Sequence, residues 1–310
     1  MSKKIWKILI IFGLGAIVAF VIGWRIYQLS INQEYKTDHF KINELVYSDQ
    51  PFTWNKLAPL NPDFPVDKDG IIIYADQYYH PGQIANQGLF YLDSFHQTNN
   101  QEYLVLAKKY AAKLLEIAHQ ERGSLYFPYP FDFALHGFKD DVVKAPWYSG
   151  MTQGEALSLF VRLYEITADQ QYLEAAERTF KSFQNLRSDK AQPWTVWVDK
   201  EGFYWIEEYP EDIPDQTLNG FIYGLYGLYD FYRLEKDDSS KILIEASLTT
   251  LKRYLGDFRN PGGISFYCLK HKRASESYHQ THIKQLQILY QMTGDEYFKT
   301  MADNFYQDYH

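Results

Sequence analysis

The chain has 310 residues, enough to bury one large hydrophobic core or two modest ones. Its formal net charge of -8 argues against an extended nucleic-acid interface. The single cysteine, Cys268, rules out a disulfide framework within the chain. Aromatic residues make up 18% of the sequence, a bias that suits a carbohydrate cleft, although most of these rings are expected to fill helix interfaces.

Residues 1–29 are predicted to form a membrane anchor. Residues 8–24 carry no charge, basic residues precede them, and Arg25 follows. A helix over this run measures roughly 25 Å, near the lower limit for crossing a bilayer. No small-x-small cleavage site follows it, which favours an uncleaved anchor over a signal peptide. The positions of the basic residues predict a cytoplasmic N-terminus, with the remaining chain outside and the lipid bilayer as a partner.

Residues 30–80 are predicted to form a tether and an irregular, β-containing region. Pro51, Pro59 and Pro65 oppose a helix in this segment. The apolar run Gly70–Tyr74 predicts one short strand.

A repeat begins at Pro81 and is expected to fill residues 81–310. Apolar helical segments alternate with short polar turns, and the apolar residues recur at i, i+3 and i+4. The pattern predicts four helical hairpins. Their turns lie at residues 97–100, 167–170, 235–238 and 293–295.

Stacked hairpins bury one face of each helix, so the predicted fold is mainly α, an incomplete α/α toroid. Aromatic, β-like excursions separate the hairpins, and we expect them to gather at one mouth of the toroid. They cover residues 125–133, 194–209 and 264–269. Because loops on a rigid frame commonly carry function, the site is expected at this mouth.

Five sequence phrases follow one another in the later part of the chain. They lie at residues 146–154, 205–210, 218–221, 266–271 and 278–286. In content and order they resemble the C-terminal domain of glucuronyl C5-epimerases. The resemblance implies inversion of glucuronic to iduronic acid within a polysaccharide, without a metal or nucleotide cofactor. Related enzymes are dimeric, and the aromatic-rich surface is compatible with a homodimer.

The resemblance also implies which residues work in the site. The catalytic groups fall on Glu208, Tyr209, Tyr267 and Tyr278. A further residue, Lys270, falls where the family usually has an arginine, and lysine lacks the bidentate grip on a carboxylate. Cys268 replaces a customary aspartate, and residues 275–277 also depart from the family pattern.

Inversion at C5 requires a proton-transfer group on each face of the sugar ring. We predict that Glu208 and Tyr278 form the opposed pair, with Tyr209 and Tyr267 tuning or replacing them. A phenolate base would need nearby positive charge, which Lys270 and its neighbours could supply. In a strand, adjacent side chains point to opposite faces, so only one of Glu208 and Tyr209 is expected to face C5.

Other side chains are predicted to bind the substrate. His271 and Arg273 would assist Lys270, because an acidic chain needs a local basic patch to hold a polyanion. The remaining candidates are Trp147, Tyr148, Asn219, His279 and His282. The rings of Trp147 and Tyr148 would either stack on sugars or fill the core. The last two histidines have i, i+3 spacing but no recognisable third ligand, so no metal site is predicted.

Three other functions fit the same pattern. A polysaccharide lyase shares the C5 proton abstraction and then expels the group at C4. A glycoside hydrolase would pair Glu208 with Asp132, Asp140 or Asp141. A non-catalytic glycan-binding protein would need no proton-transfer group, and the departures from the family phrases favour it.

Overall fold

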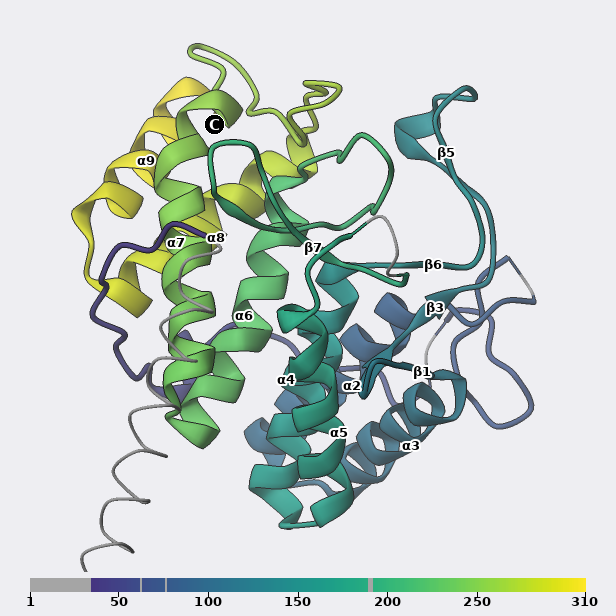
Figure 1. The fold of residues 1–310 in the computed structure, drawn as a ribbon. Coiled ribbons are helices and arrows are strands. Elements are labelled where there is room, and N and C mark those ends of the chain that lie inside the picture. The colour runs from purple at the N-terminus through teal and green to yellow at the C-terminus, as the bar shows by residue number, and fades with distance from the viewer. Residues whose placement is uncertain (1–34, 62, 76, 189–191) are drawn as a thin grey trace, which may run out of the picture.

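The computed structural model describes residues 35–61, 63–75, 77–188 and 192–310 (Figure 1). In this part of the chain, α-helices pair into four consecutive hairpins, as the polar turns predict. The pairs are α2 (Pro81–Thr98) with α3 (Gln101–Ile117), α4 (Gly150–Thr167) with α5 (Gln170–Phe180), α6 (Leu218–Glu235) with α7 (Asp238–Phe258), and α8 (Glu276–Thr293) with α9 (Glu296–Asp308).

One type of turn joins the helices of every hairpin. The first helix ends on a residue in the left-handed region, and the next residue caps the second helix with its side-chain oxygen. The left-handed residues are Asn99, Ala168, Lys236 and Gly294, with φ of 56°, 54°, 54° and 68°. The capping residues are Asn100, Asp169, Asp237 and Asp295. The polar turns of the repeat therefore mark the structural hairpins.

The first helix of each hairpin belongs to an inner row. Helix α4 packs against α2 and α6, and α6 packs against α8 (Figure 1). Helices α4 and α6 approach most closely at glycines, because a Cβ on Gly154 would lie 2.5 Å from the Cα of Gly224. One continuous hydrophobic core includes residues from all eight helices.

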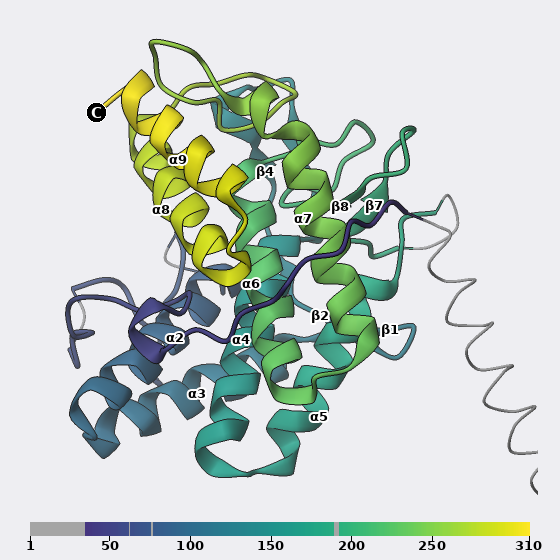
Figure 2. The same cartoon turned by 90° about the vertical axis from the view of Figure 1, so that its left-hand side faces the viewer.

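The segment before α2 lies across the helices instead of forming a loose tether. It crosses the side of the helical domain formed by α7 and α6 (Figure 2). The backbone N–H of Phe40 donates to the side chain of Glu245. The side chains of Phe40 and Phe52 pack in the same core as the helices. The predicted boundary at residue 80 therefore separates two parts of one packed unit. A short 3₁₀ helix, η1 (Tyr47–Asp49), lies within the segment.

The strand predicted over Gly70–Tyr74 is not formed. Isolated bridges instead join Val66 to Ile72 and Tyr74 to Tyr78. Asp67 accepts hydrogen bonds from the backbone N–H of Asp69 and Ile71, and these bonds close a tight turn. The apolar run thus pairs through single bridges with a residue on either side of it, Val66 and Tyr78, and does not extend into a strand.

The predicted excursions contain short antiparallel pairs. Strands β1 and β2, β3 and β6, β4 and β5, and β7 and β8 form separate two-stranded sheets. Their bounds are His119–Glu121, Ser124–Tyr126, Pro128–Tyr129, Phe133–Ala134, Val142–Val143, Trp147–Tyr148, Val196–Val198 and Tyr204–Ile206 for β1 to β8. Two further 3₁₀ turns are η2 (Leu135–Gly137) and η3 (Lys181–Gln184). The loop before α8 carries only isolated bridges, Thr217 to Cys268 and Phe266 to Ala274.

The β4–β5 hairpin and the loop before α8 both lie on the upper side of the molecule in Figure 1, whereas the α4–α5 turn lies on the lower side. These two excursions thus lie at one end of the helical frame. Within the described residues, no helix is both long and apolar enough to cross a bilayer. The predicted anchor over residues 1–29 lies outside the described residues.

Candidate active site

The four predicted catalytic residues lie together at this end. The Tyr267 hydroxyl lies 3.3 Å from each carboxylate oxygen of Glu208, and it lies 3.3 Å from the hydroxyl of Tyr209. The ring of Tyr278, in the first turn of α8, has its centroid 4.4 Å from that of Tyr267. Tyr278 is 39% exposed whereas Glu208 is 4% exposed, so the cluster runs from the surface to a buried carboxyl group.

The position of Glu208 depends on Gly220 in the first turn of α6. A Cβ at Gly220 would lie 2.7 Å from both Cβ and Cδ of Glu208, closer than real side chains approach. The backbone around Glu208 is tied down as well, since Glu207 donates its N–H to Thr195 and accepts from the N–H of Gly150. Glycine at position 220 therefore makes room for the carboxylate against the helix.

Both Glu208 and Tyr209 line one cavity of about 120 Å³. The reason for expecting only one of them to face C5 does not hold, because β8 ends at Ile206 and the next residues form a bend. Strand alternation therefore does not apply to them. Aromatic rings form most of the remaining wall, including Phe131, Phe133 and Trp147.

Burial shifts the proton equilibria of the cluster. Loss of solvent raises the pKa of Glu208 from 4.5 to about 8, although the Tyr209 and Tyr267 hydroxyls oppose that rise. Burial also raises the pKa of Tyr209 and Tyr267 well above their ordinary value, and raises that of Tyr278. The phenols are therefore protonated at neutral pH, and Glu208 is the group that can change its charge.

Lys270 is held by two acidic side chains. Its ammonium nitrogen lies 2.7 Å from Glu211 and 2.8 Å from Asp141. Two carboxylates more than offset one ammonium charge, so Lys270 has no spare positive charge for a phenolate or a substrate carboxylate. Neither carboxylate was predicted to bind it.

His271 and Arg273 differ in their availability. His271 lies between two carboxylates, with Nδ1 2.8 Å from Asp215 and Nε2 2.7 Å from Asp141. Arg273 is exposed and donates to the carbonyl of His136. Among the described residues, no carboxylate lies within ion-pair distance of Arg273, which leaves its charge open to an anionic ligand.

Trp147 lies at the border between two hollows, and Tyr148 lines one of them. Trp147 is buried, stacks on Tyr129 at 3.8 Å, and donates its indole N–H to Phe131. It lines the cavity with Glu208 and also a neighbouring depression of about 590 Å³, where Tyr148 and Trp194 lie as well. The two residues therefore act as part of the core and as the wall of a groove.

Asn219, His279 and His282 are buried, and the two histidines are bound within the protein. Ser265 contacts both imidazoles, at 2.8 Å from His279 and 2.9 Å from His282. His279 also donates through Nε2 to the Tyr309 carbonyl at 2.8 Å. These histidines join α8 to the segments packed against it, and we assign them a structural role instead of the predicted substrate-binding role. Asn219 follows the α6 N-terminus, and its carbonyl accepts from Gln285.

Sequence reasoning missed several polar residues near the site. Glu155 is 4% exposed, and burial raises its pKa to about 8, with the charge of Glu208 contributing. Asn86 donates to one of its oxygens. His136 and Asp215 were missed too, and they lie beside Cys268 and His271 in the structure. The only local signal for that cluster is the Cys-x-x-His spacing of residues 268–271.

The family comparison agrees with the resemblance in sequence. The D-glucuronyl C5-epimerase C-terminus family matches residues 123–307. A D-glucuronyl C5-epimerase from Caenorhabditis elegans is 30% identical over 181 residues, which cover 52% of this chain and 29% of that protein. An uncharacterized protein of Methanocaldococcus jannaschii is 27% identical over 184 residues, covering 59% of this chain and 58% of its own. The chain thus matches less than two thirds of either relative.

Solved structures support the fold class. A cellobiose 2-epimerase from Bacillus thermoamylovorans superposes with a TM-score of 0.54 at 14% identity, covering 81% of this chain and 68% of that one. At this identity the likeness concerns the fold alone. It places the helical hairpins in the α/α toroid class, as the repeat predicts.

Proposed function

The chain belongs to the D-glucuronyl C5-epimerase C-terminus family, and from this premise we propose that it inverts C5 of glucuronic acid residues within a polysaccharide, giving iduronic acid. The observation that carries the proposal is the contact of the Tyr267 hydroxyl with both oxygens of Glu208, beside Tyr209 and Tyr278. It groups one titratable carboxyl with three phenols where a sugar can approach from the exposed side.

The proposed reaction moves one proton off C5 and another onto its opposite face. Ionised Glu208 takes the C5 proton, and the electron pair of the broken C–H bond moves into the substrate carboxylate. The Tyr278 hydroxyl then gives its proton to C5 from the other face, which leaves a neutral Glu208 and a phenolate. The pair is reset when the proton on Glu208 passes through the Tyr267 hydroxyl to Tyr278, or when Glu208 releases its proton to solvent and Tyr278 takes one from solvent.

The charge that builds up on the substrate carboxylate needs a cation or strong donors. Lys270 was the predicted cation, but Asp141 and Glu211 already bind its ammonium group. We therefore assign the carboxylate to Arg273, with Lys270 holding the surrounding acidic side chains in place. Arg273 also suits this role because its planar guanidinium binds carboxylates through two parallel hydrogen bonds.

The polymer is proposed to lie along the depression of about 590 Å³ that shares Trp147 with the Glu208 cavity. The cavity itself is smaller than the roughly 300 Å³ of a typical ligand pocket, so only the reacting edge of the ring would enter it. The larger depression offers the half-buried ring of Tyr148 as a face for a neighbouring sugar. We further propose that residues 1–29 anchor the enzyme in a bilayer with its site outside the cytoplasm. A homodimer is compatible with this arrangement.

The test is incubation of the full chain in detergent micelles with glucuronate-containing polymers in deuterated water, followed by NMR at C5. Deuterium at C5, with some inverted uronate and an intact chain, supports the epimerase. New reducing ends without an unsaturated uronate chromophore would indicate a hydrolase, and new reducing ends with that chromophore would indicate a lyase. Binding without any of these products would indicate a glycan-binding protein.

Two variants separate the proposed roles in that test. Glu208→Gln removes the base and should abolish deuterium incorporation. Tyr278→Phe removes the proposed acid but leaves Glu208, so exchange on the original face should persist at a reduced rate while inversion is lost. Equal inversion by Tyr278→Phe and the wild type would rule out Tyr278 as the proton donor.

A further inference from the structure

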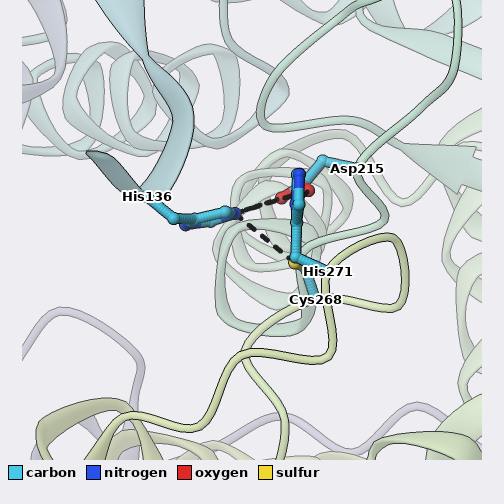
Figure 3. Close-up of side chains that lie close together, drawn as sticks. All are labelled: His136, Asp215, Cys268 and His271. Atoms are coloured by element: carbon cyan, nitrogen blue, oxygen red, sulfur yellow. Dashed lines mark hydrogen bonds and ion pairs between the residues drawn. The ribbon is translucent and has the colours of Figure 1, made fainter. Parts of the chain in front are cut away.

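Four side chains that can bind a metal ion meet next to the proposed active site. They are His136, Asp215, Cys268 and His271, and their ligand atoms all lie within 4.8 Å of one another (Figure 3). They come from three separate segments: the η2 turn, the loop before α6, and the loop before α8. Asp215 and Cys268 are fully buried, and the two histidine rings cover them from the outer side.

Four of the six distances between these atoms are comparable to the edges of a small tetrahedron. Sulfur–nitrogen distances are 3.4 Å from Cys268 to His136 and 3.6 Å from Cys268 to His271. Oxygen–nitrogen distances from Oδ1 of Asp215 are 3.4 Å to Nε2 of His136 and 2.8 Å to Nδ1 of His271. Around a tetrahedral zinc ion these edges would measure about 3.6 Å and about 3.3 Å, from the usual Zn–S, Zn–N and Zn–O bond lengths.

We propose that these four residues bind one divalent transition-metal ion of the zinc type. One thiolate, two imidazoles and one carboxylate form a mixed ligand set that suits zinc, whereas magnesium and calcium prefer oxygen ligands. The ligand atoms are Sγ of Cys268, Nε2 of His136, Nδ1 of His271 and Oδ1 of Asp215. Four protein ligands fill a tetrahedral shell, as in structural zinc sites.

The surroundings orient two of the ligands. When His271 binds metal through Nδ1, its proton lies on Nε2, which is 2.7 Å from an Asp141 oxygen. This is the carboxylate–histidine–metal arrangement that fixes the tautomer and ring direction of metal-binding histidines. On the Asp215 side, the Thr217 hydroxyl donates to Oδ2 at 2.8 Å. These contacts occupy Nε2 of His271 and Oδ2 of Asp215, so the other atom of each ligand, Nδ1 or Oδ1, is left directed at the cluster.

The backbone of His136 sets the direction of its ring. This residue has φ 52° and ψ 19°, in the left-handed region, which histidine adopts more often than most residues do. The Arg273 guanidinium donates to its carbonyl and so supports that conformation. The outcome is that the imidazole at the tip of an excursion turns inward toward Cys268.

A metal ion at this place would join the excursion that precedes α4 to the loop that carries Tyr267. The His136 ring lies 5.1 Å from the Tyr267 ring and 6.3 Å from the Tyr209 ring. The ion would therefore fix the wall of the active site without contacting Glu208. Its existence does not depend on the proposed reaction, because every ligand is identified by geometry.

The test is metal binding by the full chain in detergent micelles, with no histidine tag. We expect about one zinc ion per chain to remain after dialysis. Cobalt(II) should replace it and produce a thiolate-to-cobalt charge-transfer band. Since Cys268 is the single cysteine, that band can come from no other residue of the chain.

Three variants make the result specific. Cys268→Ser should abolish the charge-transfer band, and Asp141→Asn should weaken zinc binding by about 10–100-fold, as loss of a carboxylate behind a histidine ligand does elsewhere. His39→Ala is the matched control, because the His39 side chain is 96% exposed and lies outside the cluster, and it should bind as the wild type does. If Cys268→Ser does not fold, His136→Ala provides the second ligand deletion.

Two outcomes would overturn the proposal. One is a folded wild-type chain that retains no more zinc or cobalt than a folded ligand deletion does. The other is a cobalt complex without the charge-transfer band, which would place the ion away from Cys268. Because neither readout uses catalysis, failure of the metal site and failure of the proposed epimerase are distinguishable.

Discussion

The Tyr267 hydroxyl lies 3.3 Å from both oxygens of Glu208, although 59 residues separate the two in the chain. The contact forms because the loops that carry them meet at the start of α6. There Leu218 donates its N–H to the Tyr267 carbonyl, and Thr217 forms a bridge with Cys268. Helix α6 thus aligns the phenol of one loop with the carboxyl group of the other.

This relationship predicts how C5 exchange depends on pH. Burial raises the pKa of Glu208 to about 8, and only the ionised form can accept the C5 proton. Deuterium incorporation should therefore rise roughly tenfold for each pH unit below 8 and level off above it. The measurement is the initial exchange rate by NMR between pH 6 and 9.5.

Tyr267→Phe serves as the comparison in the same series. Its hydroxyl stabilises the charged form of Glu208, so removing it should move the midpoint to a higher pH. A midpoint near 4.5 in the wild type, or one that Tyr267→Phe shifts downward, would contradict the assignment of Glu208 as the buried base.

A second prediction concerns the space at Gly220. The Gly220→Ala variant places a Cβ within 2.7 Å of the Glu208 side chain, so the carboxyl group must move. A displacement of about 1 Å at a catalytic group can cost about 100-fold in rate, and we expect a loss of that size in C5 exchange. Gly256→Ala, where a Cβ in α7 meets nothing within 4 Å, is the control and should retain the wild-type rate. Equal activity of the two variants would show that Glu208 needs no such space.

The four hairpins were predictable because each turn carries its own chemistry. A left-handed residue followed by Asn or Asp both ends one helix and starts the next, as at Asn99 and Asn100. Local rules fail where residues leave regular structure. Strand alternation was applied to Glu208 and Tyr209, yet the strand ends before them.

The site was predictable in part for a different reason. The resemblance identified Glu208 and Tyr267, but residue spacing could not show that Lys270 would be bound by Asp141, 129 residues away. His136 lies 132 residues from Cys268, and no periodic pattern links positions so distant. Such pairs depend on how the excursions fold over the helical frame, which tertiary packing decides.

A third prediction concerns stability. The folded pKa of Glu208, about 8, lies above its ordinary value of 4.5, so between these pH values the folded chain holds a proton that the unfolded chain has released. The contribution of Glu208 to the free energy of unfolding therefore falls as the pH rises from 4.5 through 8. Glu208→Gln removes the contribution of this group, so the free energy of unfolding of the variant should exceed that of the wild type by roughly 2–4 kcal/mol at pH 9, but by little at pH 4.5.

Urea unfolding of both proteins at the two pH values measures this difference. Exposed Glu102→Gln, at the start of α3, is the control, and its effect should change little with pH. If Glu208→Gln were less stable than the wild type at pH 9, the carboxylate would have to be stabilised by partners inside the fold, and the exchange argument would fail with it.

The last prediction tests how the segment before α2 is held. Arg162 of α4 is 5% exposed, pairs with Asp230 at 2.9 Å, and donates to the carbonyls of Pro51 and Phe52. Arg162→Ala should lower the free energy of unfolding by about 3 kcal/mol, the low end for breaking a buried pair, because Arg233 still contacts Asp230. Backbone amides near Phe52 should then exchange hydrogen faster than those of the inner helices.

Arg178→Ala on α5, which has no ion pair within the described part of the chain, should cost less than about 0.5 kcal/mol and leave that exchange unchanged. Equal effects of the two variants would mean that apolar contacts such as Phe52 hold the segment without help from Arg162.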